Sequence, residues 1–170
     1  GFKTDVTDKI TSRINFASGF RAPNLSELSS NGVHEGSNRY EIGNSNLKTE
    51  QNFQVDLNVD YNSEHFDFFA NGFYNNINNY IFISPNGNTI DANFVYDYLQ
   101  NNAVLYGGET GIHLHLHEID WLHMTSSYEM VIGKLENNLS LPLIPANQWK
   151  NNFRANFDVS KNIKNSFVFL

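Results

Sequence analysis

The sequence predicts an all-β fold built from long antiparallel strands. Apolar and polar side chains alternate with a period of two along most of the 170 residues, and no stretch sustains the helical period of about 3.6 residues. The composition agrees, because the chain holds 27 Asn residues and 14% aromatic residues, which are typical of turns and strands respectively. Charged residues make up only 17% of the chain, below the roughly 25% of an average soluble domain.

The clearest alternating segment is Gln51–Tyr61. Its odd-numbered positions from Phe53 to Tyr61 are apolar or aromatic, whereas its even-numbered positions from Asn52 to Asp60 are polar. Every second side chain lies on the same face of a strand, so this segment predicts one apolar face and one polar face. Similar alternation predicts strands over Lys9–Phe20, Gln51–Tyr61, Glu64–Ile83 (with a β-bulge near Phe73, where the register blurs), Val95–His117, Asp120–Gly133 and Gln148–Ser160, and a partial strand from about Ile163.

The connections between these strands fall into a short class and a long class, and the long ones contain all four Pro residues. Short turns at one end of a sheet and long loops at the other are typical of outer-membrane β-barrels, with periplasmic turns and extracellular loops. A soluble antiparallel sheet with one buried face shows the same alternation, but its strands average only about 5 or 6 residues. The expected tight turns are Asp5–Asp8, Asn62–Glu64, His117–Asp120 and Ser160–Asn162, and the expected long loops are Arg21–Lys48, Ser84–Phe94 and Lys134–Asn147.

Charge and composition exclude several functional classes. The 11 Lys and Arg residues against 18 Asp and Glu residues give a net charge of −7, so nucleic acid is not expected as a partner. The absence of Cys excludes disulfide scaffolds, cysteine-ligated metals and thiol chemistry. No apolar run approaches the roughly 20 residues of a membrane helix. Because the chain lacks a signal peptide and ends within an apolar run at Leu170, we expect a fragment of a longer protein.

Two boxes in the sequence resemble those of a known family. Phe20–Leu28 (FRAPNLSEL) resembles the F-R-A-P-N-L-x-E-L box of TonB-dependent outer-membrane receptors. Gly43–Glu50 (GNSNLKTE) is similar to the G-N-P-x-L-K-P-E box of the same family, with Ser45 and Thr49 where the family usually has Pro. Shorter similarities follow at Asn78–Ile81, Tyr106–Glu109 and Leu141–Pro145.

The resemblance implies part of the C-terminal half of an antiparallel transmembrane β-barrel of about 22 strands, closed around an N-terminal plug. Residues 1–170 would supply about eight strand segments of this barrel domain, with the plug domain and the C-terminal closing strands absent. The implied function is active import of a scarce ligand, such as a siderophore, haem or another large nutrient, across the outer membrane of a Gram-negative bacterium. The implied partners are the TonB complex (through the missing N-terminal region), the receptor's own plug domain, an extracellular ligand and the lipid bilayer.

Other functional classes stay open on the residues alone. A passive porin-like channel would show the same strands and loops, and a soluble β-sandwich that binds carbohydrate would show the same alternation. An enzyme is not expected, because the chain contains no nucleophile elbow, phosphate-binding loop or metalloprotease helix motif. No cofactor is expected either.

Three residues of the long loop between the two boxes are candidates for ligand binding. Haem-importing members of the family carry a His between these boxes, so the resemblance implies His34 as a candidate haem ligand. Arg39 and Tyr40 are candidates for hydrogen bonding to and stacking on a large polar ligand. The alternative is that all three are solvated loop residues.

His113, His115 and His117 are candidate metal ligands, because residues at every second position of a strand share one face. A His-x-His pair can supply two zinc ligands, and His123 across the turn is a further candidate. The alternative is that these are polar side chains of the barrel lumen near its periplasmic end. The spacing identifies no carboxylate ligand.

In an intact barrel, the alternation also predicts which side chains meet lipid and which meet the lumen. The expected lipid-facing set is Phe53, Val55, Leu57, Val59, Trp149, Phe153 and Phe157, and the expected lumen-facing set is Gln54, Asp56, Asn58, Lys150 and Arg154.

Overall fold

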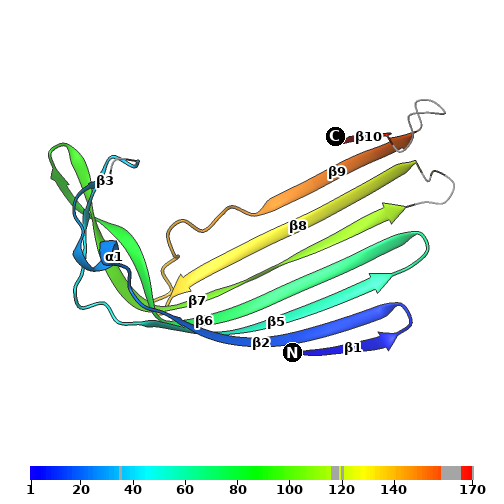
Figure 1. Cartoon of the computed structure of the whole chain (residues 1–170), viewed down its shortest axis with the longest axis horizontal. Helices are drawn as coiled ribbons and strands as arrows, with labels where there is room; N and C mark the ends of the chain where they lie inside the picture. Colours follow the sequence, from blue (N-terminus) through cyan, green and yellow to red (C-terminus); the bar gives the residue numbers. More distant parts are fainter. Residues whose placement is uncertain (35, 116–118, 120, 158–165, 170) are drawn as a thin grey trace.

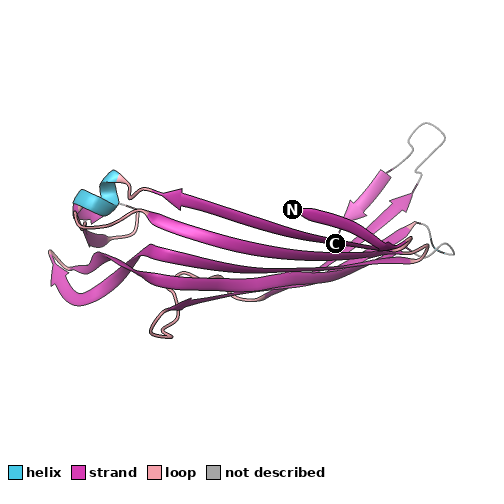
Figure 2. Ribbon diagram, turned by 90° about the horizontal axis from the view of Figure 1, so that it is seen from below, coloured by secondary structure: helices cyan, strands magenta, loops and turns pink. Residues whose placement is uncertain are grey.

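The computed structural model describes the chain except residues 35, 116–118, 120, 158–165 and 170. The described residues form one long, curved sheet, shown in Figures 1 and 2. Its hydrogen-bonded order is β1-β2-β5-β6-β7-β8-β9-β10, and all of these neighbours are antiparallel. The strands are β1 (Phe2–Thr7), β2 (Ile10–Arg21), β3 (Asn31–His34), β4 (Arg39–Ile42), β5 (Glu50–Asn62), β6 (Phe66–Ile90), β7 (Asn93–His115), β8 (Leu122–Leu135), β9 (Gln148–Phe157) and β10 (Ser166–Phe169).

The predicted all-β fold with long antiparallel strands is confirmed. β6 has 25 residues and β7 has 23, several times the average strand of a globular protein. The helix α1 (Leu25–Ser29) has five residues, and no helix of the described chain is long and apolar enough to cross a membrane. The β1–β2 and β5–β6 turns lie at one end of the sheet in Figure 1, here called the short-turn end, and α1, β3 and the β6–β7 turn lie at the other end.

The connection over residues 21–48 was expected to be an irregular loop, and this expectation is wrong in part. It contains α1 and the hairpin formed by β3 and β4, and β4 pairs in parallel with β7. The loop expected over residues 84–94 is also wrong, because β6 continues to Ile90 and turns directly into β7 at Asp91 and Ala92. Residues 134–147 remain largely irregular, as expected.

The bulge expected near Phe73 is wrong too, because the pairing of β6 with β5 and β7 continues unbroken through that residue. Phe73 is an aromatic side chain opposite Asp56, on the face that also carries Asn58 and Asn71, and this placement explains the blurred pattern. The register shifts instead lie between Ile77 and Tyr80 and between Pro85 and Thr89.

The cross-strand register gives the sheet two chemically different faces, because residues paired across strands share a face. One row runs through Leu57, Gly72, Gly108 and Met130, whereas the adjacent row runs through Asn58, Asn71, Glu109 and Glu129. The polar row contains a hydrogen bond of 2.8 Å from Asn58 Nδ2 to Asn71 Oδ1. The predicted lipid-facing and lumen-facing sets therefore lie on opposite faces.

The apolar face is uncovered over the middle of the sheet. Exposure reaches 50% for Leu57, 51% for Tyr74 and 72% for Trp149. A small apolar core lies instead where the 134–147 loop folds back on the sheet, with Ala103, Leu135 and Leu141 at its centre. The described chain thus buries little apolar surface within itself.

Candidate functional site

Arg21, at the end of β2, joins two segments that are distant in the sequence. Its Nη1 donates to both carboxylate oxygens of Glu27 at 2.9 Å, and its Nε donates to Glu50 Oε2 at 2.7 Å. The Glu27 and Glu50 side chains are only 11% and 12% exposed, whereas Arg21 is 44% exposed. Charge-assisted hydrogen bonds of this length are among the strongest in proteins. We call Arg21, Glu27 and Glu50 the arginine node.

Glu27 also fixes the start of α1. The Asn24 side chain accepts from the Glu27 backbone N–H at 2.8 Å, and the Glu27 carboxylate accepts from the Asn24 backbone N–H at 2.8 Å. This reciprocal arrangement is a capping box, which satisfies backbone donors that a helix N-terminus leaves free. One carboxylate therefore serves the helix cap and the ion pair together.

The segment of residues 43–50 packs closely on α1 and on the sheet. Gly43 N–H donates to the Ser30 carbonyl at 2.7 Å, and a Cβ at Gly43 would lie 2.6 Å from the Ser30 backbone nitrogen. Asn44 N–H donates to the Glu27 carbonyl at 2.8 Å. At the other end of the segment, Glu50 Oε1 accepts from the Ile81 backbone N–H at 2.6 Å. The base of this long connection is therefore held by hydrogen bonds on both sides.

The β3–β4 hairpin docks on the extended part of β7. Glu41 in β4 is 3% exposed and accepts from Arg39 Nε at 2.7 Å and from Tyr98 Oη at 2.9 Å. Burial by itself raises the pKa of Glu41, but the hydrogen bonds from Arg39 and Tyr98 outweigh it, so its pKa lies below the usual value. The Arg39 guanidinium also lies 5.6 Å from the ring centre of Tyr96.

The structure brings the three loop candidates together in this hairpin. His34 ends β3 and pairs with Arg39 at the start of β4. His34 is exposed, with its Nδ1 3.4 Å from Ser37 Oγ, and the Tyr40 hydroxyl donates to Asn31 Oδ1 at 2.8 Å. Arg39 directs its charge toward Glu41 and is 29% exposed. Whether these residues contact a ligand stays a prediction.

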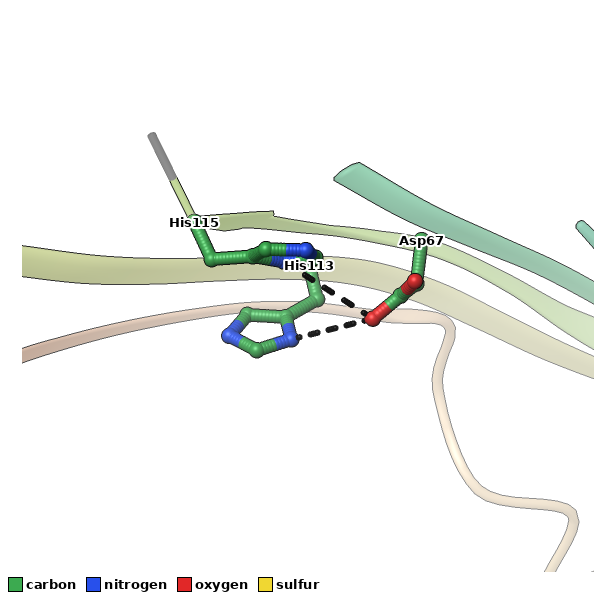
Figure 3. Close-up of side chains that lie close together, drawn as sticks. All are labelled: Asp67, His113 and His115. Atoms are coloured by element: carbon green, nitrogen blue, oxygen red, sulfur yellow. Dashed lines mark ion pairs between the residues drawn. The ribbon is translucent and has the colours of Figure 1, made fainter. Parts of the chain in front are cut away.

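A second cluster lies at the short-turn end of the sheet. Asp67 in β6 pairs directly with His113 in β7, and His115 follows two residues later on the same face. Asp67 Oδ2 lies 3.6 Å from His113 Nδ1 and 3.8 Å from His115 Nδ1, as Figure 3 shows. The His123 ring stacks on His113 with the ring centres 5.6 Å apart. His117, the third residue of the predicted set, lies outside the described residues.

Comparison with known proteins decides the family. The model of the family described as TonB dependent receptor-like, beta-barrel, matches residues 2–165. The chain belongs to this family. A search of the curated proteins finds no match.

The solved structures similar to this receptor chain are themselves larger. The copper transporter OprC matches with a TM-score of 0.74 and 19% identity, over 90% of this chain and 23% of OprC. The siderophore receptor PirA from Pseudomonas aeruginosa matches with a TM-score of 0.62 and 18% identity, over 94% of this chain and 35% of that one. The ferric enterobactin receptor PfeA from the same organism matches with a TM-score of 0.61 and 21% identity, over 94% and 25%. The chain therefore corresponds in fold to part of the barrel of these receptors.

Sequence reasoning found the two TonB-dependent receptor boxes but not what joins them. Arg21 and Glu27 come from the first box and Glu50 from the second, and they meet in the arginine node. Glu41 and Asp67 were also missed, because each acquires its role from pairing with β7. Only the register of distant strands identifies such residues.

Proposed function

We propose that this chain is part of the barrel domain of an outer-membrane receptor that imports a scarce ligand with energy from the TonB complex. The observation that carries the proposal is the family match over residues 2–165 on a sheet with an uncovered apolar face. The chain spans about a quarter to a third of the length of the receptors that it matches. The plug domain, the TonB-contacting region and the strands that close the barrel would then lie in other parts of the protein.

The apolar face is proposed to contact lipid, and the polar face to line the lumen around the plug. Exposed Phe53, Leu57 and Trp149 on one face suit hydrocarbon and its interface, where aromatic side chains are enriched. On the other face, Lys150 Nζ donates to Glu129 Oε2 at 2.8 Å, a pairing suited to a water-filled or plug-filled interior. We therefore infer that the protein resides in the outer membrane of a Gram-negative bacterium.

The β3–β4 hairpin is proposed to contact the ligand. It stands at the long-loop end, which is extracellular in this proposal, and the buried Glu41 with its two hydrogen bonds fixes its position. His34 is exposed and pairs with Arg39, and Tyr40 follows on the opposite face of β4, so the hairpin offers an imidazole, a guanidinium that is paired with Glu41, and an aromatic ring. These groups suit a large anionic or metal-chelating ligand, such as a siderophore or haem.

The experiment is an uptake assay with cells that express the full-length receptor. Cells with and without TonB are given radiolabelled ferric siderophores, haem or cobalamin as separate probes, and accumulation is measured. TonB-dependent accumulation of one probe, and weaker binding of that probe after His34→Ala with Tyr40→Ala, supports the proposal. Accumulation that is equal with and without TonB identifies a passive channel and overturns it.

A further inference from the structure

The cluster at the short-turn end has the donor set and the spacing of a metal site. The potential ligand atoms of Asp67, His113 and His115 all lie within 4.8 Å of one another. All three come from adjacent strands of a continuous antiparallel pair, so the backbone register fixes their spacing. We propose that Asp67, His113 and His115 bind a divalent transition-metal cation such as Zn²⁺ on the polar face. This site goes beyond the proposed uptake function, because its cation is a resident of the barrel wall rather than imported cargo.

The distances within the cluster are close to those that a bound cation requires. Two ligands at about 2.0–2.1 Å from a tetrahedral zinc ion lie about 3.3–3.5 Å from each other. Asp67 Oδ2 lies 3.6 Å from His113 Nδ1 and 3.8 Å from His115 Nδ1. Both imidazoles direct Nδ1 toward the same carboxylate oxygen in Figure 3. The two carboxylate-to-imidazole distances therefore need to shorten by only a few tenths of an ångström, and the ligand atoms of His113 and His115 lie within 4.8 Å of each other.

The second ring nitrogen of His115 has a partner outside the cluster. Its Nε2 lies 3.3 Å from the backbone carbonyl oxygen of Ser63, which can only accept a hydrogen bond. A proton on Nε2 would donate to this carbonyl and leave the lone pair of Nδ1 available to a metal. Metal-binding His residues usually donate their second ring nitrogen to a carbonyl or carboxylate in this way.

The Nδ1 atom of His115 is buried and has no hydrogen-bond partner among the described residues. In the neutral ring it faces Asp67 Oδ2, so two hydrogen-bond acceptors face each other at 3.8 Å. A cation between them satisfies both at once. The alternative is a second proton on the imidazole, which would form an ion pair with Asp67. A doubly protonated ring has no lone pair for a metal, so metal binding distinguishes the two arrangements.

The donor set also indicates which cation fits. Imidazole nitrogen suits Zn²⁺, Co²⁺, Ni²⁺ and Cu²⁺, whereas Mg²⁺ and Ca²⁺ prefer sites made of oxygen alone. Side-chain exposures of 37% for His113, 26% for His115 and 39% for Asp67 leave a path for the ion. The three protein ligands leave a fourth position for water or for another side chain.

The test is metal binding by the purified full-length receptor in detergent, after removal of metal by EDTA. Zn²⁺ is titrated in competition with a chromophoric chelator, and Co²⁺ binding is followed by visible absorption. We expect one Zn²⁺ per chain in the unmodified receptor. Asp67→Asn and His115→Gln should each weaken binding by at least about 10- to 100-fold, the range for loss of even an outer-shell partner. Both should also remove the tetrahedral Co²⁺ absorption.

Asp60→Asn is the matched control, because Asp60 is a carboxylate of the same face that lies outside the cluster. It should leave Zn²⁺ affinity unchanged. Heat-modifiable migration establishes that each variant is folded, and His115→Gln carries the test if Asp67→Asn does not fold. The proposal is overturned if the receptor binds no stoichiometric Zn²⁺, or if the Asp67 and His115 variants bind Zn²⁺ as tightly as the unmodified receptor. The ion pair between Asp67 and a protonated imidazole is then the remaining explanation of the cluster. Uptake is measured separately in cells, so a failure of the transport proposal appears as a loss of TonB-dependent accumulation and not as a loss of Zn²⁺ binding.

Discussion

Replacing Arg21 by Met tests whether the arginine node holds the base of the long connection. The substitution removes the cation and keeps much of the side-chain volume, so the carboxylates of Glu27 and Glu50 lose their shared partner at exposures of 11% and 12%. Removing one partner of a fully buried ion pair costs about 3–5 kcal/mol. Because Arg21 itself is 44% exposed, water screens part of the interaction, and we expect about 2–3 kcal/mol.

Native-state hydrogen exchange of the full-length receptor measures this loss locally. The reporters are the backbone amides of Ser30, Gly43 and Asn44, which donate to carbonyls of α1 and its C-terminal end at 2.7–2.9 Å. A loss of about 2–3 kcal/mol corresponds to about 30- to 140-fold faster exchange when these amides open locally.

The control is Arg13→Met, which removes an exposed Arg from the same strand but not from the node. The double variant Arg21→Met with Glu27→Gln should recover part of the protection, because only one carboxylate then lacks a cation. If Arg21→Met accelerates exchange no more than Arg13→Met, the node does not hold this segment, and the reasoning from its burial is refuted.

Three further predictions test the faces of the sheet and the hairpin. Leu57→Arg should impair assembly far more than Asn58→Arg in heat-modifiable migration, because an Arg at mid-depth on a lipid-facing side costs about 2–4 kcal/mol; equal effects would contradict the face assignment. The lowered pKa of Glu41 means that its contribution to hairpin stability is present above its usual pKa and is lost as pH falls through the lowered value. Amide exchange of β3 and β4 should therefore accelerate at acid pH, and Glu41→Gln should remove that dependence. Gly43→Ala should destabilise the same connection by about 1–3 kcal/mol in amide exchange, because its Cβ would lie 2.6 Å from the Ser30 nitrogen, whereas unchanged exchange would show that the loop adapts.

The long strands could be predicted from the sequence because their signal is local. In β5 the alternation from Phe53 to Tyr61 reports directly which side chains share a face, and the structure keeps that division across β6, β7 and β8. Turn chemistry was a poorer guide. Asn86 and Gly87 follow Pro85 and suggest a loop, yet they form a bulge within β6, where Gly87 has a φ of 85°.

The reversal itself occurs at Asp91 and Ala92, with φ of 48° and 62°. Neither residue is a Gly, so the local sequence favours the Asn86-Gly87 pair over Asp91 and Ala92 as the site of the turn. The hairpin of β3 and β4 was hidden for a different reason. β4 is stabilised by parallel pairing of Tyr40 with Val95 and by the contact of Glu41 with Tyr98, both more than 50 residues away.

The candidate metal cluster shows the same limit. The spacing of His113 and His115 indicates a shared face, but the carboxylate that completes the set is Asp67, 46 residues before His113. Its position opposite His113 follows from the register of β6 against β7, and a slip of one residue would place it on the apolar face. Alternation fixes only the parity of that register, because a slip of two residues keeps every side chain on its own face.

The residues of the arginine node belong to the two family boxes and lie outside the hairpin that is proposed to contact the ligand. Arg21, Asn24 and Glu27 of the first box, and Gly43 and Glu50 of the second, each have a structural partner in ion pairs, caps or close backbone contact. These five residues of the two boxes therefore stabilise the base of the connection. The hairpin lies between the two boxes and is carried on this base. If the hairpin contacts the ligand as proposed, variation in the hairpin would alter the ligand that is bound without disturbing the node that positions it.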